Sequence, residues 1–228
     1  MARKSKDKTI LILQAAKKVF AEEGYHSASV SRIAKEAGIG DGTIYLYFQN
    51  KEDILIKLFH RAIYDEFVPK VEMRVMHMSD PRMMLYELVR THLEFFGDDY
   101  YLAKVIQIES RQTKQNIREA RLPGVRRYFQ LIESIVKKGQ EQGIFRNDIS
   151  ERTARKIIFG SLDEVVTCWV LSKKKYMLIT RFEEVYKLLL QAISNFSHLS
   201  FLALLSPIQQ GEQKTEVKQD YEEGSSHC

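Results

Sequence analysis

Apolar residues recur with the period of an α-helix along most of the chain. In the first stretch they occupy positions i, i+3, i+4, i+7 and i+8, namely Ile12, Ala15, Ala16, Val19 and Phe20. Such spacing places them in one stripe along a helix. The pattern predicts a helix over about residues 8–23, ended by Gly24.

Two short helices are expected next, separated by a glycine-containing turn. Ser29 suits the N-cap of the first, which ends at Gly38. Asp41 is a plausible cap for the second, which covers Thr43 to Phe48 and is two turns at most. Three helices therefore fit into about 45 residues.

Longer helices are predicted for the rest of the chain. From Lys51 the helical period continues for about 25 residues, and such a helix must connect two parts of the molecule. Pro123 suits a helix start, Gly143 the residue that follows a helix, and Asp148 or Ser150 a cap. The remaining helices are expected at about 82–96, 99–114, 123–142, 150–172 and 179–197. Since no stretch alternates like a strand, the fold is predicted to be all-α.

Composition indicates a folded protein of a reducing compartment. Hydrophobic residues make up 44% of the 228 positions, and the two cysteines, Cys168 and Cys228, form no disulfide framework or metal cluster. No secretion signal and no apolar stretch near the roughly 20 residues of a membrane span are seen. We expect a cytoplasmic protein without membrane contact.

No sequence motif points to catalysis. There is no glycine-rich phosphate loop, zinc-protease motif or nucleophile elbow, and the six histidines are scattered. The chain is therefore predicted not to be an enzyme and to need no cofactor or metal.

Positive charge is concentrated at the N-terminal end. The whole chain carries 35 basic and 30 acidic residues, a balance of +5, and residues 1–51 hold nine Lys or Arg against five acids, a balance of +4. A polyanionic partner such as double-stranded DNA is plausible. Residues 207–228 are acidic, with almost nothing apolar, and are predicted to be a disordered tail.

The short helices and their tight turn describe a helix-turn-helix, whose later helix enters the DNA major groove. Gly24, Tyr25 and the ungapped run from Ser29 to Leu55 closely resemble the N-terminal domain of TetR-family transcriptional regulators. One departure is Tyr47, where many members carry His. The resemblance implies DNA contacts from seven residues: Ser31, Arg32, Gly42, Thr43, Tyr45, Tyr47 and Lys51. Tyr47 and Lys51 would hold the phosphate backbone.

The last two helices are expected to form a homodimer. Residues 157–171 are apolar over more than half of the helix circumference, which is too wide for a surface helix. Pairing with a symmetry copy into a four-helix bundle is the simplest solution, and it is the usual dimer of the family. The predicted interface residues are Val165, Leu188, Leu189, Ala192, Ile193 and Phe196.

A second resemblance concerns the middle of the chain. Residues 41–55 and 108–112, with Ile158, Phe159, Gly160, Asp163, Glu164, Thr167, Trp169 and Val170, look like the FadR-type branch, which are acyl-CoA-responsive repressors of fatty-acid degradation genes. This implies a ligand with a long acyl chain and a phosphorylated nucleotide. The predicted ligand-binding residues are Phe96, Leu102, Ile106, Arg111, Phe129, Phe159, Leu162, Val166 and Trp169. Asp163 and Glu164 are expected to form salt bridges rather than ligand contacts.

The sequence thus divides into a helix-turn-helix domain at residues 1–50, a ligand-binding and dimerisation domain at 51–198, and an extension at 199–228. A dimeric repressor released from a palindromic operator by long-chain acyl-CoA is the function that the resemblance implies. A TetR-type regulator that responds to another hydrophobic molecule or drug is the main alternative, and an adaptor that uses the same dimer without DNA is another.

Overall fold

The computed structural model describes residues 2–108, 115–173 and 176–195, with the side chains of all of these except residues 2–7 and 115–122. In chain order the helices are α1 (Ala2–Glu23), α2 (Val30–Ala37), α3 (Asp41–Tyr45), α4 (Lys51–Phe59), η1 (His60–Phe67), α5 (Val68–Val75), α6 (Pro81–Gly97), α7 (Tyr100–Gln107), α8 (Gln115–Glu141), α9 (Glu151–Leu171), η3 (Leu178–Arg181) and α10 (Phe182–Ile193). Arg111, Phe196, Cys228 and the predicted tail lie outside the described residues.

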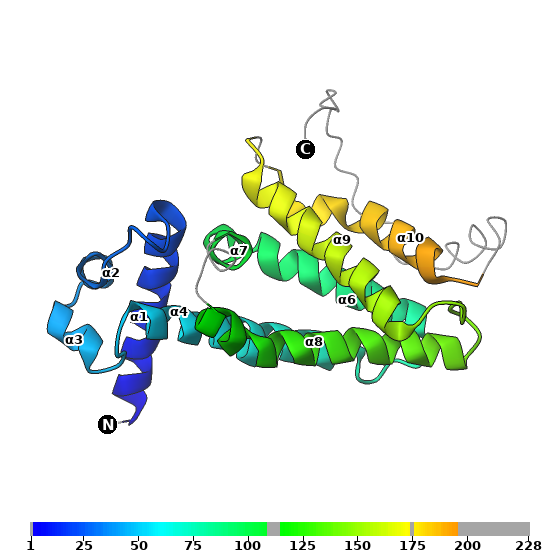
Figure 1. Ribbon diagram of the computed structural model, residues 1–228, viewed down its shortest axis with the longest axis horizontal. Helices are drawn as coiled ribbons and strands as arrows, with labels where there is room; N and C mark the ends of the chain where they lie inside the picture. Colours follow the sequence, from blue (N-terminus) through cyan, green and yellow to red (C-terminus); the bar gives the residue numbers. More distant parts are fainter. Residues whose placement is uncertain (1, 109–114, 174–175, 196–228) are drawn as a thin grey trace, which may run out of the picture.

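The prediction of an all-α fold is confirmed. Within the described ranges the only β contact is an isolated bridge between Phe145 and Ser194. No helix in this part of the chain is long and apolar enough to cross a membrane. Figure 1 shows α1, α2 and α3 at one end of the molecule and the crossing helices α6, α8, α9 and α10 at the other, with α4 between them.

Local capping explains the short helices at the N-terminal end. Ser29 caps α2, because its side chain accepts the Arg32 backbone N–H at 3.1 Å, and Gly38 ends the helix in the left-handed region at φ +66°. We expected Asp41 to cap α3, but Gly40 holds the N-cap position and Asp41 is the first residue of the helix. The Asp41 carboxylate instead accepts a hydrogen bond from the Ser31 hydroxyl and so ties α3 to α2.

The predicted long helix from Lys51 is continuous to Val75, but its middle part, η1, is a π-helix. The backbone N–H of Val68 donates to the carbonyl of Ile63, five residues back. Pro69 lies one position later, where a proline has no N–H to donate to the carbonyl four residues before it. The Asp65 carbonyl therefore lacks an α-helical hydrogen bond, and the wider π-helical turn lies directly before the proline.

The C-terminal helices share one hydrophobic core with the N-terminal helices. Ser150 caps α9 by accepting the Thr153 N–H at 3.2 Å, and Gly143 has φ +68° after the end of α8. The expected helix start at Pro123 is wrong, because α8 begins at Gln115 and Pro123 lies inside it. At the next residue, Gly124, α8 passes close to η1: an added Cβ would lie 3.1 Å from Ile63 Cγ2.

Polar contacts join the two ends of the molecule. Lys17 of α1 pairs with Asp99, whose other oxygen accepts the Leu102 N–H and caps α7. Nearby, the Tyr101 hydroxyl donates to Glu22 at 3.0 Å. The N-terminal helices are therefore attached to α7 as well as to α4.

Candidate functional site

The outer surface of α3 consists of residues that are exposed to solvent and not packed into the protomer core. Tyr45 is 58% exposed and Leu46 80% exposed, and Gly42 is also exposed. On the inner side Ile44 and Phe48 are buried in the hydrophobic core, and α3 packs against α2. One side of this short helix is therefore available to contact another molecule.

The other residues predicted to contact DNA lie around this helix in different environments. Ser31 is exposed, and Thr43 and Tyr47 are half-buried, with Tyr47 packed against the hydrophobic core. Arg32 is occupied by two ion pairs, to Glu23 at 2.8 Å and to Glu36 at 3.0 Å. Its guanidinium therefore joins α2 to α1, and a DNA contact would have to compete with two carboxylates.

Lys51 does not have the surroundings expected of a phosphate-binding side chain. Its ammonium donates to the carbonyls of Tyr25 at 2.7 Å, His26 at 3.0 Å and Ala28 at 2.7 Å. An ammonium has three N–H donors, and all three are used. Burial lowers the pKa of Lys51, and its Nζ lies 4.7 Å from the centroid of the Tyr25 ring.

The start of α4 is equally unsuited to an added anion. Asn50 accepts the Asp53 N–H at 2.9 Å, Asp53 accepts the Gln49 N–H at 3.0 Å, and the first turn also carries Glu52. Two acidic side chains would oppose a phosphate at this helix end. We therefore reassign Lys51 to holding the turn between α1 and α2.

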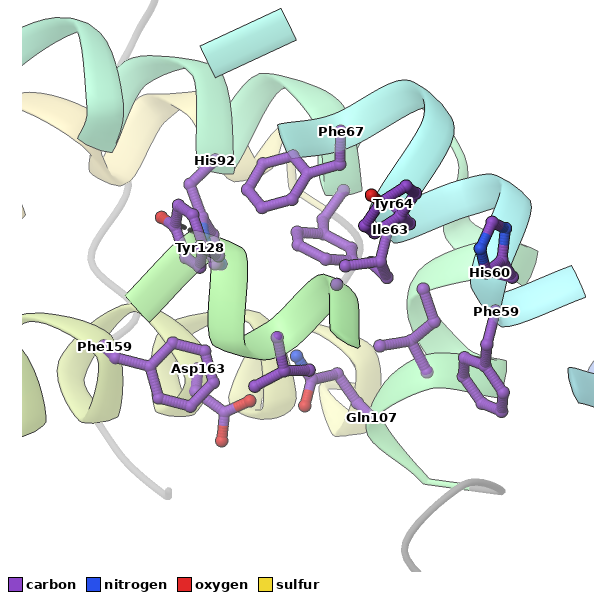
Figure 2. A pocket seen from close by; sticks show the side chains of 14 residues that line it. Phe59, His60, Ile63, Tyr64, Phe67, His92, Gln107, Tyr128, Phe159 and Asp163 are labelled. Atoms are coloured by element: carbon purple, nitrogen blue, oxygen red, sulfur yellow. Dashed lines mark hydrogen bonds between the residues drawn. The ribbon is translucent and has the colours of Figure 1, made fainter. Parts of the chain in front are cut away.

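A second site is a cavity of about 310 Å³ among α4, η1, α6, α7, α8 and α9. Its lining is mainly apolar and aromatic: Phe59, His60, Ile63, Tyr64, Phe67, His92, Phe96, Ile106, Gln107, Gly124, Val125, Tyr128, Phe159 and Asp163. Figure 2 shows these side chains converging from helices far apart in sequence. A mainly apolar cavity with a few polar groups is typical of a site for a small organic ligand.

The polar groups of the cavity include one buried pair. His92 Nδ1 lies 3.0 Å from the Tyr128 hydroxyl, as Figure 2 shows, and both side chains are almost completely buried. Burial lowers the pKa of His92 to about 3 and raises the pKa of Tyr128. The imidazole is therefore neutral near pH 7. Gln107 is also buried and accepts a hydrogen bond from the Thr167 hydroxyl at 3.2 Å.

The buried His92 predicts a loss of stability in mild acid. Its unfolded pKa is near 6.5 and its folded pKa about 3, so below pH 6.5 only the unfolded chain takes up the proton. The free energy of unfolding should fall by about 2 kcal/mol from this group between pH 7 and pH 5. Urea unfolding of wild type and His92→Gln at both pH values measures it. His77→Gln, which removes an exposed histidine, is the control; equal pH dependence in wild type and His92→Gln would contradict the prediction.

Three of the predicted ligand-binding residues line the cavity: Phe96, Ile106 and Phe159. Leu162 and Val166 face the protomer core, with no exposed surface. Leu102 lines a separate hollow between α1 and α7. Arg111 cannot be placed, since it lies outside the described residues.

The aromatic residues Phe129 and Trp169 are not part of the cavity lining. Phe129 packs on Phe159, with ring centroids 4.8 Å apart, and under the Arg155 guanidinium. The Trp169 ring N–H donates to the Tyr176 carbonyl at 2.7 Å. Asp163, for which we favoured a salt bridge over a ligand contact, is part of the lining.

We expected the long helix from Lys51 to reach the pocket near its far end, but none of its residues was among the predicted ligand-binding residues. Five residues of α4 and η1 line the cavity: Phe59, His60, Ile63, Tyr64 and Phe67. Their apolar period was visible, but the period does not tell which neighbour a helix faces. His92 was passed over because a lone histidine carries no motif.

The outer surface of α9 and α10 has exposed apolar side chains. Leu188 is 64% exposed, Ala192 is exposed, and Val165 is half-buried at a groove between the two helices. Leu189 and Ile193, which we also placed in the interface, are 3% and 1% exposed and belong to the protomer core. Phe196 lies beyond the last described residue.

Models of two protein families match adjacent parts of the chain. The model described as "Bacterial regulatory proteins, tetR family" matches residues 12–58, and that described as "YsiA-like protein, C-terminal region" matches residues 59–192. Among curated proteins, the fatty acid metabolism regulator protein of Bacillus subtilis is 37% identical over 193 residues, which cover 85% of this chain and 99% of that protein.

Solved structures agree with these matches. The fatty acid degradation regulator FadR from Bacillus halodurans is 43% identical with a TM-score of 0.77, over 80% of this chain and 94% of that one. FadR from Bacillus subtilis, in complex with stearoyl-CoA, is 38% identical with a TM-score of 0.76, over 81% and 98% of the two chains. The similarity therefore extends through both the α3 surface and the cavity.

Proposed function

The chain belongs to the tetR family of bacterial regulatory proteins, and from this premise we propose that it is a homodimeric transcriptional repressor of fatty acid degradation that an acyl-CoA releases from DNA. Members of this family act as transcription regulators and not as enzymes. Within the described residues, no cluster of three or more candidate metal ligands occurs. A repressor that works on chromosomal DNA would be located in the cytoplasm.

The observation that carries the proposal is the combination of two separate sites in one short protomer. The α3 surface presents Tyr45 and Gly42 to solvent, and the cavity offers an apolar, aromatic lining to a chain-like ligand. A relative of 38% identity, aligned over 81% of this chain, was crystallised with stearoyl-CoA. That relative supports an acyl-CoA, rather than an unrelated drug, as the ligand of this cavity.

The division between the sites follows the predicted domains. Residues 1–50 would bind the operator and residues 51–198 would bind the ligand and the second subunit. An α-helix fits the major groove, and a two-fold dimer reads two half-sites about one helical turn apart. We propose that Tyr45, Thr43 and Gly42 approach the base edges, and that Ser31 and Tyr47 support contacts to the backbone.

Replacing Tyr45 tests the DNA-binding role of α3. Tyr45→Ala should weaken binding to a palindromic operator by about tenfold or more, because a base contact contributes roughly 1–3 kcal/mol and the dimer loses it twice. Tyr45→Phe should recover the part that depends on the ring. Fluorescence anisotropy with a labelled operator measures both.

Met73→Ala is the control for Tyr45→Ala, since it also removes a large exposed side chain (66% exposed) but on α5. Its operator affinity should equal that of wild type. Equal affinities of Tyr45→Ala and wild type would remove Tyr45 from the DNA interface.

A further inference from the structure

The π-helix η1 lies at the point where the cavity meets the helix that leads to the DNA-binding end. Its residues His60, Ile63, Tyr64 and Phe67 line the cavity, and α4 continues directly into it from Lys51. π-Helical turns are rare and occur frequently at functional sites. A change in the register of this segment would alter the cavity and the connection to α4 together.

Two side-chain pairs match the π-helical spacing. Arg61 pairs with Glu66 at 2.8 Å, and His60 Nδ1 lies 3.3 Å from Asp65, each five residues apart. In an α-helix, residues five apart lie about 140° apart around the axis and do not face each other. These contacts therefore stabilise the π register specifically. The His60 contact is the weaker, since an imidazole carries charge only when protonated.

The same segment also contains the acid that would pair with Arg61 if η1 were an α-helix. In an α register Arg61 would face Asp65, four residues on, instead of Glu66. Neighbouring acids at positions 65 and 66 thus give Arg61 one partner in each register. Pro69 sets the balance towards the wider turn, because in the α register it would meet the Asp65 carbonyl without an N–H.

The contact with α8 makes the register matter to the cavity. An added Cβ on Gly124 would lie 3.1 Å from Ile63 Cγ2 and 3.3 Å from the Tyr64 backbone nitrogen, so α8 leaves little free space beside η1. The Arg127 guanidinium, paired with Glu72, also lies 5.2 Å from the Tyr64 ring centroid. Moving one residue out of the wide turn would displace Ile63 and Tyr64 from these positions and change the cavity.

We infer that η1 is a register switch: the π form is the state that binds the acyl-CoA, and an α-helical form of the same segment belongs to the operator-bound state. The inference rests on the proposed function and specifies its regulation. A ligand shifts such an equilibrium only through its unequal affinity for the two forms. The cavity described above is built by the π register, so the ligand favours it.

The test compares two neighbouring substitutions of equal charge change. Glu66→Gln removes the π-register partner of Arg61. Asp65→Asn removes its α-register partner together with the weaker π-register contact to His60; both side chains are about half exposed. Glu66→Gln should raise the stearoyl-CoA concentration that releases half of the operator, and Asp65→Asn should lower it, each by about two- to fivefold. Pro69→Ala should act in the same direction as Glu66→Gln and more strongly.

A second measurement separates this inference from the proposed function. The NMR scalar coupling across the hydrogen bond from the Val68 N–H to the Ile63 carbonyl, in protein free of ligand and DNA, should be weaker in Glu66→Gln and stronger in Asp65→Asn than in wild type, because in the α register this N–H bonds to the Tyr64 carbonyl instead. Failure of stearoyl-CoA to release the wild type would count against the proposed function, and the coupling between Val68 and Ile63 would then decide the inference alone. Shifts in the same direction, or none, in both variants and in both measurements would overturn the register switch.

Discussion

Leu188→Glu is expected to convert the dimer into monomers and to weaken operator binding on the order of 100-fold or more. Leu188 lies on the outer surface of α10, 64% exposed in the protomer, beside the groove formed with α9. In a two-fold interface the substitution would bury two uncompensated charges, each costing about 3–5 kcal/mol. A monomer would read one half-site and lose the contacts of the other.

Sedimentation velocity and operator titration measure this effect. Met76→Glu is the matched control, because Met76 is also 64% exposed but lies at the end of α5. The control should remain dimeric and bind DNA as wild type does. A Leu188→Glu protein that sediments as a dimer would place the interface elsewhere. Leu189→Glu is not a substitute, since a charge at a 3% exposed core position would unfold the protomer.

Lys51→Ala is expected to destabilise the DNA-binding end by about 2–3 kcal/mol. The substitution removes the donor of three backbone carbonyls: the bonds to Tyr25 and Ala28 are partly buried, and the bond to His26 is exposed. A buried acceptor left unsatisfied costs about 1–3 kcal/mol, so the two partly buried carbonyls account for the expected loss. The chain between α1 and α2 would lose its main polar restraint. Thermal unfolding followed by circular dichroism measures the loss.

The salt dependence of DNA binding distinguishes this structural role from a phosphate contact. Removing a lysine that neutralises a phosphate lowers the slope of log K against log salt by about one. For Lys51→Ala we expect the same slope as for wild type and for the control Lys137→Ala, which alters an exposed lysine of α8. A slope lower by one, with stability unchanged, would restore the phosphate role that the sequence suggested.

Features set by neighbouring residues were predictable from the sequence. Ser29 and Gly38 mark the ends of α2 because a cap depends on one side chain and one backbone angle within a few residues. Gly143 and Ser150 were assigned for the same reason. Each of these signals acts within one turn of helix, so no knowledge of distant packing was needed.

Features set by distant packing were not predictable in the same way. A helical wheel places both Leu188 and Leu189 on apolar arcs, but only the position of α6 and α9 decides that Leu189 is buried and Leu188 is not. Pro123 looked like a helix start, yet the contact between Gly124 and η1 belongs to a helix that passes through it. For Lys51, its partners are 23 to 26 residues away in sequence.

The cavity illustrates the same limit. Phe96, Ile106 and Phe159 were identified from apolar periods, but Leu162 and Val166 on the same helix as Phe159 face the core. The π-helix left a local trace in Pro69 and in the acids at positions 65 and 66, which acquire meaning only once the five-residue hydrogen bond of Val68 is seen.

We expect an acyl-CoA to release this repressor from its operator. The most direct test is to titrate the complex of ligand-free protein and operator with acyl-CoAs of increasing chain length. Because each buried methylene contributes roughly 0.8 kcal/mol, affinity should rise about fourfold per added carbon until the cavity is full, and free CoA should release little. If no acyl-CoA of any chain length released protein that still binds its operator, acyl-CoA would not be the effector.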